Sequence, residues 1–317
     1  MLTGLGLPAI AVLLAAGVLL DLLLGEARRW HPLVGFGNLA YALERKLNRG
    51  QRRYWRGLLA WLLAVTPPVV AATLLCVAGG PAVDALLLYF CIGLRSLRDH
   101  NLPIAQALQS GDLDTARQLT ARIVSRDTAG ASATDLAKAS AESLLENGND
   151  AVFGTLFWFV VAGGPGAVLF RLANTLDAMW GYRTTRLLRF GCAAARIDDA
   201  LNYLPARLTA LSYVLLASTM EGKRRAWHCW RAQAPAWSSP NAGPVMASGA
   251  GALGLALGGP AIYDGEIEHR PPLGSGQPAG AQDIARAWQL VARTTWLWLA
   301  CTAAVAVTLY LKGHWHA

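Results

Sequence analysis

Three acidic side chains in the segment ATDLAKASAESLLENGNDA recur at a spacing that suits metal or acid–base chemistry. Glu142, Glu146 and Asp150 stand at positions i, i+4 and i+8, so a helix that persists through Gly148 places them on one face. Like charges four residues apart destabilise a helix by about 0.2–0.5 kcal/mol, and a divalent cation or a cationic partner removes that cost. The spacing therefore indicates either a cation-binding site or a solvated acidic face.

A second group of polar side chains lies among apolar residues in the segment 171–211. Asn174 and Asp177 are three residues apart, and Asp198 and Asn202 are four apart, so each pair can face one way on a helix. Ionisable residues beside or inside membrane segments are costly and are usually paired or functional. The pattern indicates either a binding site or an Arg–Asp network that stabilises helices. The other members of the group are Arg196, Asp199 and Arg207.

A third candidate begins at Ser239-Pro240-Asn241 and continues through GAGALGLALGG to Tyr263-Asp264-Gly265. Backbone N–H groups in Gly-rich turns can approach a phosphate closely. No Gly-Lys-Ser or Gly-Lys-Thr follows, and no strand precedes the run, so it matches neither the P-loop nor the dinucleotide-binding fingerprint. Close helix packing explains the glycines equally well. His31, a lone histidine before a proline, by itself indicates a structural role.

Two helices are expected to position the acidic residues. Gly111 and Asp112 have the residue types of a turn and a helix cap, and the apolar stripe that follows predicts a helix ending near Arg126-Asp127-Thr128. A second helix then carries the acidic residues. The segment 95–150 as a whole is therefore expected to be polar and helical.

The composition places these segments in a membrane protein. Of 317 residues, 54% are apolar and 15% charged, against about 45–50% and about 25% in an average soluble domain. These values exclude a disordered chain and a nucleic-acid-binding tail. The net charge of +8 and the twelve Trp fit basic flanks and interfacial anchors of membrane spans, so the expected partner is the lipid bilayer and not nucleic acid.

Hydropathy predicts an all-α polytopic integral membrane protein with about five transmembrane helices and cytoplasmic helical loops. An apolar run of about 18–20 residues can cross a hydrocarbon core of about 30 Å. The run at 7–24 has neither the basic flank nor the cleavage site of a signal peptide, so it is expected to be a span. The run at 82–94 is short for a span, and the Gly163-Gly164-Pro165-Gly166 sequence splits another. The candidate spans are 7–24, 57–78, 151–172, 203–220 and 294–311.

Charge predicts the orientation. Residues 25–56 carry eight Lys and Arg against two Glu, which predicts a cytoplasmic loop, and the 95–150 segment is expected on the same side. Residues 221–290 are rich in Gly and Pro and are expected to be a loop segment. No internal repeat divides the chain, so a single membrane-embedded domain over 1–317 is expected.

Seven stretches in chain order resemble the cobalamin-biosynthesis family CbiB/CobD, the adenosylcobinamide-phosphate synthases. Ser125 stands where that family usually has Gly, and Ala151 and Thr155 stand where it usually has Gly and Pro. These departures lie beside the acidic helix and bear on its geometry. The stretches are DLLLGEARRWHPLVGFG, IGLRSLRDH, ARQLTARIVSRDT, AESLLENGNDAV, NTLDAMWGYR, FGCAAARIDDALNYLPARLTAL and SPNAGPVMASGAGALGLALGGPAIYDG.

The resemblance implies a multi-pass enzyme of the inner (cytoplasmic) membrane with its active site on the cytoplasmic side. It implies a synthase that uses ATP and Mg²⁺ to join a corrinoid, adenosylcobyric acid, to 1-amino-2-propanol or its O-phosphate through an amide. A carboxylate and an ammonium ion do not condense at neutral pH without activation, and an acyl phosphate supplies the leaving group. Metal ligands, cations and a base are then needed. Other membrane enzymes of cobalamin assembly are further expected partners.

The resemblance also implies roles for the candidate residues. Glu142, Glu146 and Asp150 are expected to serve Mg²⁺ or base chemistry. The cations expected to meet phosphate or propionate charge are Arg126, next to the catalytic candidate Asp127, and Arg196 and Arg207. The other expected substrate-binding residues are His31, Asn174, Asp177, Asp198, Asp199, Asn202, Ser239 and Asn241.

Two other classes of function remain open at this point. A related branch resembles AmpE, a membrane regulator, although the SPNAG and NTLD blocks favour the cobalamin branch. A carrier would instead place Asp21, Asp84 and Asp177 along one pathway. The pattern of a CDP-alcohol phosphotransferase is absent, because Ala195-Arg196 lacks the preceding Asp-Gly. The sequence leaves the identity and phosphorylation of the amino-alcohol and the oligomeric state open.

Overall fold

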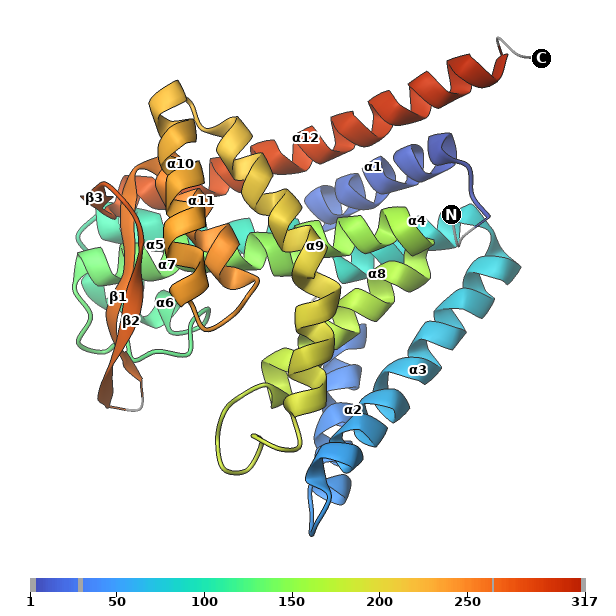
Figure 1. Cartoon of the computed structure of the whole chain (residues 1–317), viewed down its shortest axis with the longest axis horizontal. Helices are drawn as coiled ribbons and strands as arrows, with labels where there is room; N and C mark the ends of the chain where they lie inside the picture. Colours follow the sequence, from blue (N-terminus) through green and yellow to red (C-terminus); the bar gives the residue numbers. More distant parts are fainter. Residues whose placement is uncertain (1–3, 28–30, 264, 315–317) are drawn as a thin grey trace. The chain divides into compact units, whose positions relative to one another are not determined.

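The computed structural model describes residues 4–27, 31–263 and 265–314, which form two compact units (Figure 1). The first unit comprises residues 1–93, 154–202 and 299–317, and the second comprises 94–153 and 203–298. Two helices, α9 (Cys192–Leu216) and α12 (Ala281–His314), each contribute residues to both units.

The first unit consists of helices packed through apolar faces. Helix α8 contacts α3 and α4, and α1 packs on α4. The rings of Trp180 and Phe190 meet edge to face at 5.1 Å in its core. A side chain at Gly57 would collide with the carbonyl group of Phe190, so this glycine permits close packing. Besides parts of α9 and α12, the helices are α1 (Leu7–Leu24), α2 (Pro32–Leu47), α3 (Arg53–Gly79), α4 (Pro81–Cys91) and α8 (Gly154–Trp180).

Four helical segments among the described residues are long and apolar enough to cross a membrane, where about five were expected. The polytopic helical class is confirmed. Helix α4 has 11 residues and covers only about 16 Å, roughly half of a hydrocarbon core. The run at 203–220 is not among the four segments, and most of it belongs to α9, which begins at Cys192 and ends at Leu216. Arg28 and Arg29, two of the basic residues predicted to orient the first loop, lie outside the described residues. The four segments are Leu7–Leu24, Arg53–Gly79, Ala133–Trp180 and Ala281–Lys312.

Helix α8 is interrupted where the sequence predicted a break. Ala162 and Gly163 leave the helical backbone region, and Gly163 has φ 64°, a conformation that favours glycine. The N–H of Gly164 donates to Oδ1 of Asp84 at 2.7 Å, and Asp84 is buried. A buried carboxylate from α4 therefore caps the second half of this broken helix.

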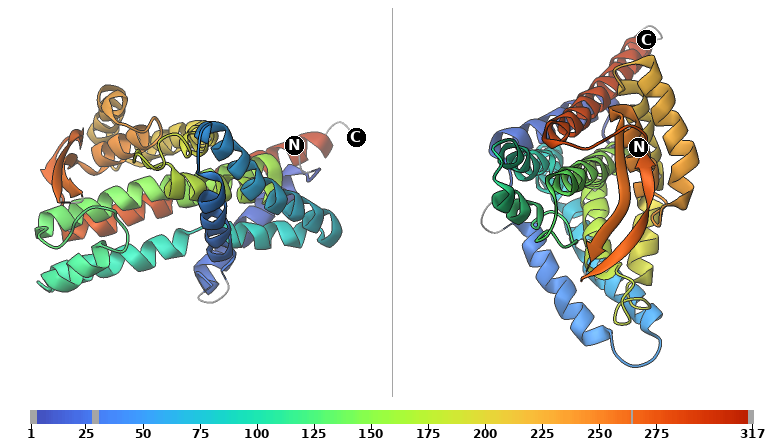
Figure 2. Two further views of the ribbon diagram at one scale, coloured as in Figure 1. Left: turned by 90° about the horizontal axis from the view of Figure 1, so that it is seen from below. Right: turned by 90° about the vertical axis from the view of Figure 1, so that its left-hand side faces the viewer.

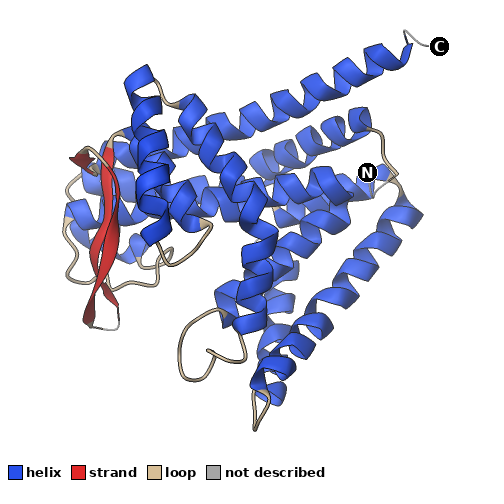
Figure 3. Ribbon diagram, in the orientation of Figure 1, coloured by secondary structure: helices blue, strands red, loops and turns tan. Residues whose placement is uncertain are grey.

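The second unit combines helices with a small sheet, drawn red in Figure 3. Strands β1 and β2 form an antiparallel hairpin, which Figure 2 shows as a twisted ribbon, and the short β3 pairs in parallel with β1. The hairpin contacts α10 and α11, and β1 contacts α7. The elements are α5 (Leu94–Gln109), α6 (Leu113–Thr120), α7 (Ala133–Gly148), the π-helical turn η1 (Asn149–Phe153), α10 (Met220–Gln233), the 3₁₀ turn η2 (Ala234–Ala236), α11 (Ala242–Leu253), β1 (Leu255–Tyr263), β2 (Glu266–Gly274) and β3 (Gln277–Pro278).

The prediction of a loop over residues 221–290 is wrong, because this segment holds α10, α11, the hairpin and the start of α12. Helices α10 and α11 pack through small residues. Gly222 and Ala226 are buried on α10, and a side chain at Gly251 would lie 2.7 Å from Cα of Ala226. The glycines that suggested a loop therefore allow two short helices to approach each other closely.

The helices predicted over 95–150 are present, with one boundary corrected. Oδ1 of Asp112 accepts the N–H of Thr115 at 3.0 Å, which confirms the predicted cap of α6. The helix ends at Thr120 and not near residues 126–128. The chain instead folds back, and the hydroxyl of Thr128 donates to the carbonyl oxygen of Arg117 at 3.1 Å. Helix α7 then begins at the predicted place, with Ser132 and Asp135 forming a capping box.

Candidate functional site

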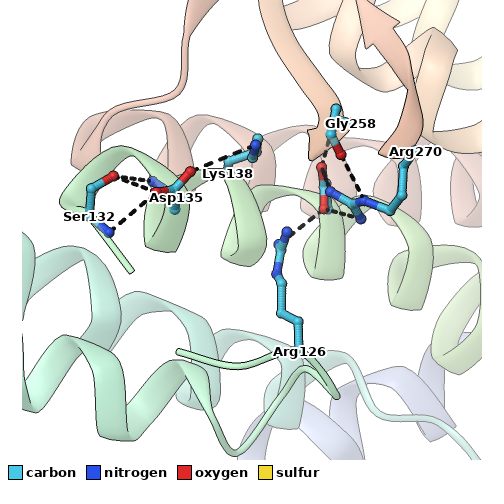
Figure 4. Close-up of polar contacts among 8 residues, drawn as sticks. Arg126, Ser132, Asp135, Lys138, Gly258 and Arg270 are labelled. Carbon is cyan, nitrogen blue, oxygen red and sulfur yellow. Dashed lines mark hydrogen bonds and ion pairs between the residues drawn. The ribbon is translucent and has the colours of Figure 1, made fainter. Parts of the chain in front are cut away.

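The carboxylate of Glu142 is the centre of a polar cluster in the second unit. Arg126 donates to its Oε2 at 3.0 Å, and Arg270 donates to both oxygens at 3.1 and 3.2 Å. The N–H of Gly258 adds a bond to Oε1 at 2.8 Å. Figure 4 shows Arg126 reaching the cluster from the loop before α7, while Gly258 and Arg270 come from the hairpin. Three distant segments therefore meet at one side chain.

The local sequence explains why the hairpin delivers these groups. The register of β1 against β2 shifts between Gly258 and Pro260, which is the position of a β-bulge. Gly258 has φ 70°, and a side chain there would collide with the carbonyl oxygen of Pro271. The bulge aims the N–H of Gly258 at Glu142 instead of at the neighbouring strand. The side chain of Arg270 is held at its own end by the carbonyl oxygen of Gly259, 3.2 Å from its Nε.

The cluster around Glu142 is buried, and it holds two positive charges against one negative charge. The side chains of Glu142, Arg126 and Arg270 are 6%, 7% and 11% exposed. Burial alone would lower the pKa of Arg270, but the charge and hydrogen bonds of Glu142 outweigh it and raise that pKa, with a further contribution from Tyr263. Guanidinium groups keep their charge in proteins, and the one carboxylate of Glu142 neutralises only one of the two. The pair can offer positive charge to an anionic group.

A cavity of about 170 Å³ adjoins the cluster. Arg126, Arg270, Glu142 and Glu146 supply its charged lining. Glu146 forms no ion pair or hydrogen bond with any other described residue, and it feels the negative charges of Asp150 and Glu142 as well as the positive charges of Arg270 and Arg126. This carboxylate is free to take a proton, a cation or an ammonium group. The volume suits a small polar group such as a phosphate or an amino-alcohol.

A second cavity, of about 290 Å³, lies on the other side of Arg126 and Ala139, which line both spaces. Its wall includes Asp127 and the apolar side chains of the hairpin tip, among them Ile262 and Ile267. Asp127 itself holds the hairpin: its N–H donates to the carbonyl oxygen of Ile262, and its Oδ2 accepts the N–H of Gly265, both at 2.8 Å. Asp127 therefore fixes the wall of this cavity. The neighbouring Asp264 lies outside the described residues.

The acidic stripe is only partly assembled. The helix continues past Gly148, as the spacing required, but through the π-helical turn η1, which holds Asp150. Such turns are often found at functional sites. Among the residues that the structure describes, no three His, Cys, Asp or Glu side chains converge as a metal site would require. Binding of Mg²⁺ by Glu142, Glu146 and Asp150 therefore stays a prediction, and Glu142 is already occupied by arginines.

The predicted substrate-binding residues of the 171–211 segment divide between the two units. In the first unit, Asn174 donates to Oδ1 of Asp198 at 3.4 Å, so those two helices are joined as the polar pattern suggested. Asp198 and Asn202 are buried, whereas Arg196 is exposed. The same unit holds Asp177 and Asp199.

His31, also in the first unit, has a structural contact. Its Nδ1 accepts the N–H of Leu33 at 3.2 Å and caps α2. Burial lowers the pKa of this imidazole, against the opposing charge of Glu26. An acceptor nitrogen used as a helix cap fits the structural role that the isolation of His31 in the sequence indicated.

Arg207 belongs to the second unit, where it contacts Asn241 of the Ser239-Pro240-Asn241 segment, the start of the third candidate site. Its guanidinium donates to Oδ1 of Asn241 at 2.6 Å and lies 3.6 Å from the centre of the Tyr203 ring. The hydroxyl of Ser239 accepts the N–H groups of Asn241 and Ala242 at the start of α11. Arg207 thus contacts Asn241, whose own N–H is bound by Ser239.

Sequence reasoning missed Arg270, which completes the cluster around Glu142, and it named Gly258 only within the GAGALGLALGG run, as part of a turn able to approach a phosphate and not as a partner of Glu142. Both residues lie in the segment taken for a loop. The bulge glycines and the lone arginine between His269 and Pro271 were the available signals. Both residues gain their role only when the hairpin packs against α7.

Comparisons with known proteins agree over most of the chain. The profile of a family described as "CobD/Cbib protein" matches residues 14–291. A protein of Stutzerimonas stutzeri named "Cobalamin biosynthesis protein CobD" is 57% identical over 286 residues, which cover 89% of this chain and 93% of that protein. A protein of the same name from Chromobacterium violaceum is 53% identical over 94% of this chain and 97% of its own length. One from Geobacter metallireducens is 41% identical over 83% and 86%. No solved structure matches.

Proposed function

We propose that this chain, which belongs to the CobD/CbiB family, forms the amide bond between adenosylcobyric acid and 1-amino-2-propanol or its O-phosphate. Membership of the family places the chain in cobalamin biosynthesis, and the reaction is the proposal. The observation that carries it is the juxtaposition of the buried Arg126–Glu142–Arg270 cluster with the unpaired carboxylate of Glu146 in one cavity.

The reaction has three requirements that these groups can meet. An oxygen of the propionate must leave with the phosphoryl group, the amine nitrogen must form a bond to the same carbon, and the ammonium must lose two of its three protons. Arg126 and Arg270 can stabilise the anionic oxygens of the reacting carboxyl group and of a phosphate. Glu146, with no other partner, can take a proton from the ammonium group. Glu142 holds both guanidinium groups in position.

ATP, when bound, supplies the phosphoryl group that turns a carboxylate oxygen into a leaving group. Mg²⁺ commonly binds proteins through one or two carboxylates together with substrate phosphates. Glu146 and Asp150 fit that donor set, because both are acidic, lie one helical turn apart and are close enough for their charges to interact. These two residues would hold the ion. Arg126 and Arg270 would orient the phosphate.

The location of the active site is part of the proposal. The eight basic residues of 25–56 support a cytoplasmic position for that loop in the inner membrane. The second unit carries the proposed site, and both ATP and the corrinoid are cytoplasmic molecules. We therefore place the second unit's cavities on the cytoplasmic side.

The test uses the full chain in lipid nanodiscs with adenosylcobyric acid, aminopropanol phosphate, ATP and Mg²⁺, and follows product by mass spectrometry. Wild-type protein should form adenosylcobinamide phosphate only when ATP is present. Glu146→Gln should abolish product formation while the protein still folds. Glu221→Gln is the matched control, because Glu221 is 88% exposed in the same unit.

Two outcomes would count against the proposal. Folded wild-type protein that forms no product with either the free or the phosphorylated amino-alcohol would exclude the synthase. Glu146→Gln activity within about threefold of wild type, or about 0.7 kcal/mol in barrier, would exclude Glu146 as base or metal ligand.

A further inference from the structure

A third cavity in the second unit, of about 480 Å³, has a lining unlike the other two. Two arginines, Arg207 and Arg231, and two indoles, Trp230 and Trp237, face it together with several prolines. No acidic side chain lines it. Its volume falls within the range of pockets that hold drug-sized ligands, about 300–1,000 Å³, and is too small to enclose a corrinoid. The lining selects a ligand that is both flat and anionic.

Of the two cations of this cavity, Arg207 is held in place, whereas Arg231 is exposed and lies 6.0 Å from the centre of the Trp227 ring. Arg207 is fixed between the ring of Tyr203 and the amide oxygen of the buried Asn241. The N–H groups at the start of α11 are already bound by Ser239, so the helix terminus does not supply the anion site. The charge of a ligand would therefore be met by Arg207 and Arg231. Guanidinium groups bind phosphates well because they donate two parallel hydrogen bonds.

The aromatic side chains of the cavity can bind the flat part of a ligand. An indole presents a flat face on which a base can stack, and such stacking contributes about 1–3 kcal/mol per base. Trp230 and Trp237 are both partly buried, whereas Trp227, one turn away on α10, is exposed and lies outside the cavity. The two indoles that face the cavity are thus held by packing.

Trp237 also connects this cavity to the proposed reaction site. The guanidinium of Arg270, which binds Glu142, lies 5.7 Å from the centre of the Trp237 ring. One aromatic side chain therefore separates the Arg207–Arg231 cavity from the buried cluster. A ligand in the cavity would lie next to the proposed site without occupying it.

We infer that this cavity binds the nucleoside triphosphate, with its base against Trp230 and Trp237 and its phosphates on Arg207 and Arg231. The inference rests on the proposed function for the identity of the nucleotide as ATP. It assigns the base and the phosphate chain to residues other than the carboxylate stripe, with only the transferred phosphoryl group reaching Arg126 and Arg270. The cavity beside Glu146 is left to that group, the amine and the reacting carboxylate.

The experiment titrates the full chain in nanodiscs with a fluorescent N-methylanthraniloyl derivative of ATP, without corrinoid. Arg231→Gln and Trp230→Leu should each raise Kd about tenfold or more. The matched controls are Arg224→Gln, an exposed arginine of the same helix, and Trp55→Leu, an exposed indole of the first unit. Both should keep Kd within about twofold. Arg231→Lys should recover part of the affinity, since it restores the charge without the planar fork.

Competition separates the two halves of the cavity. Tripolyphosphate and adenosine should each displace the probe more weakly than ATP does, because each makes only half of the contacts. The loss caused by Trp230→Leu should be absent with tripolyphosphate, and the loss caused by Arg231→Gln should be absent with adenosine.

Several results would overturn the inference. Some of them would reject only the nucleotide site, and one would also reject the proposed synthase function. Unchanged affinity in Arg231→Gln and Trp230→Leu, with ATP-dependent product still formed, would reject this cavity and keep the synthase. Wild-type protein that binds no nucleotide and forms no product would reject both. Variants that bind nucleotide normally but lose affinity for phosphatidylglycerol vesicles would show a lipid headgroup site instead.

Discussion

Removing the charge of Glu142 should loosen the β1–β2 hairpin more than removing either arginine that binds it. Glu142→Gln keeps the shape of the side chain but removes the carboxylate that forms the ion pairs of both Arg126 and Arg270, which are buried. Removing one partner of a buried pair costs about 3–5 kcal/mol, because an uncompensated buried charge remains. The free energy that holds the hairpin closed should therefore fall by about 3–5 kcal/mol in this variant.

Arg126→Gln should cost less. Arg270 still binds both oxygens of Glu142 in that variant, so no buried charge is left without its counter-ion. One hydrogen bond to a charged group is lost, which is worth about 1.5–3 kcal/mol. The order of the two variants follows from the structure: one carboxylate serves two guanidinium groups.

Hydrogen exchange of the peptide that covers the hairpin is the assay, since the N–H of Gly258 is bound directly to Glu142. At about 1.4 kcal/mol per factor of ten, Glu142→Gln should speed exchange in the hairpin by about two to four orders of magnitude. Glu221→Gln serves as the exposed control and should leave exchange unchanged. Protection unchanged in Glu142→Gln, or a larger loss in Arg126→Gln, would refute the argument that the carboxylate fastens the hairpin.

Three further predictions test other parts of the structure. A cysteine introduced at Gln51 or Gln109 should resist an impermeant thiol reagent in intact cells, and labelling at either position would contradict the cytoplasmic assignment. Hydrogen bonds from Thr115 lower the pKa of Asp112, so the stability that this cap gives α6 is present above the ordinary carboxyl pKa and is lost as pH falls through the lowered pKa of the folded state. Hydrogen exchange in α6 should therefore accelerate at acid pH. An Asp112→Asn variant with the same pH profile of exchange as wild type would exclude the titration of Asp112 as the cause. Gly163→Ala should destabilise the break in α8 by about 1–2 kcal/mol, because φ is 64° there, and an unchanged melting temperature in nanodiscs would argue against strain at this residue.

Local signals in the sequence determined the elements that depend on neighbouring residues. The first span was predicted at 7–24, the residues that α1 occupies, because the length of an apolar run sets the length of a membrane helix. The cap at Asp112, the start of α7 and the break at Gly163 were also predictable, since each depends on side chains or backbone within a few positions. The acidic stripe was visible for the same reason.

Tertiary structure alone decided how these parts combine. Glu142 and Arg270 are 128 positions apart, and Arg207 and Asn241 are 34 apart, so no local spacing relates them. The segment 221–290 was taken for a loop because Gly and Pro disfavour isolated helices and strands. Once Gly251 lies against Ala226, the same small residues permit close packing, and the hairpin is carried onto α7. The sequence shows which residues can do chemistry, but their partners are set by packing between distant segments, whose free energy no short stretch of the chain contains.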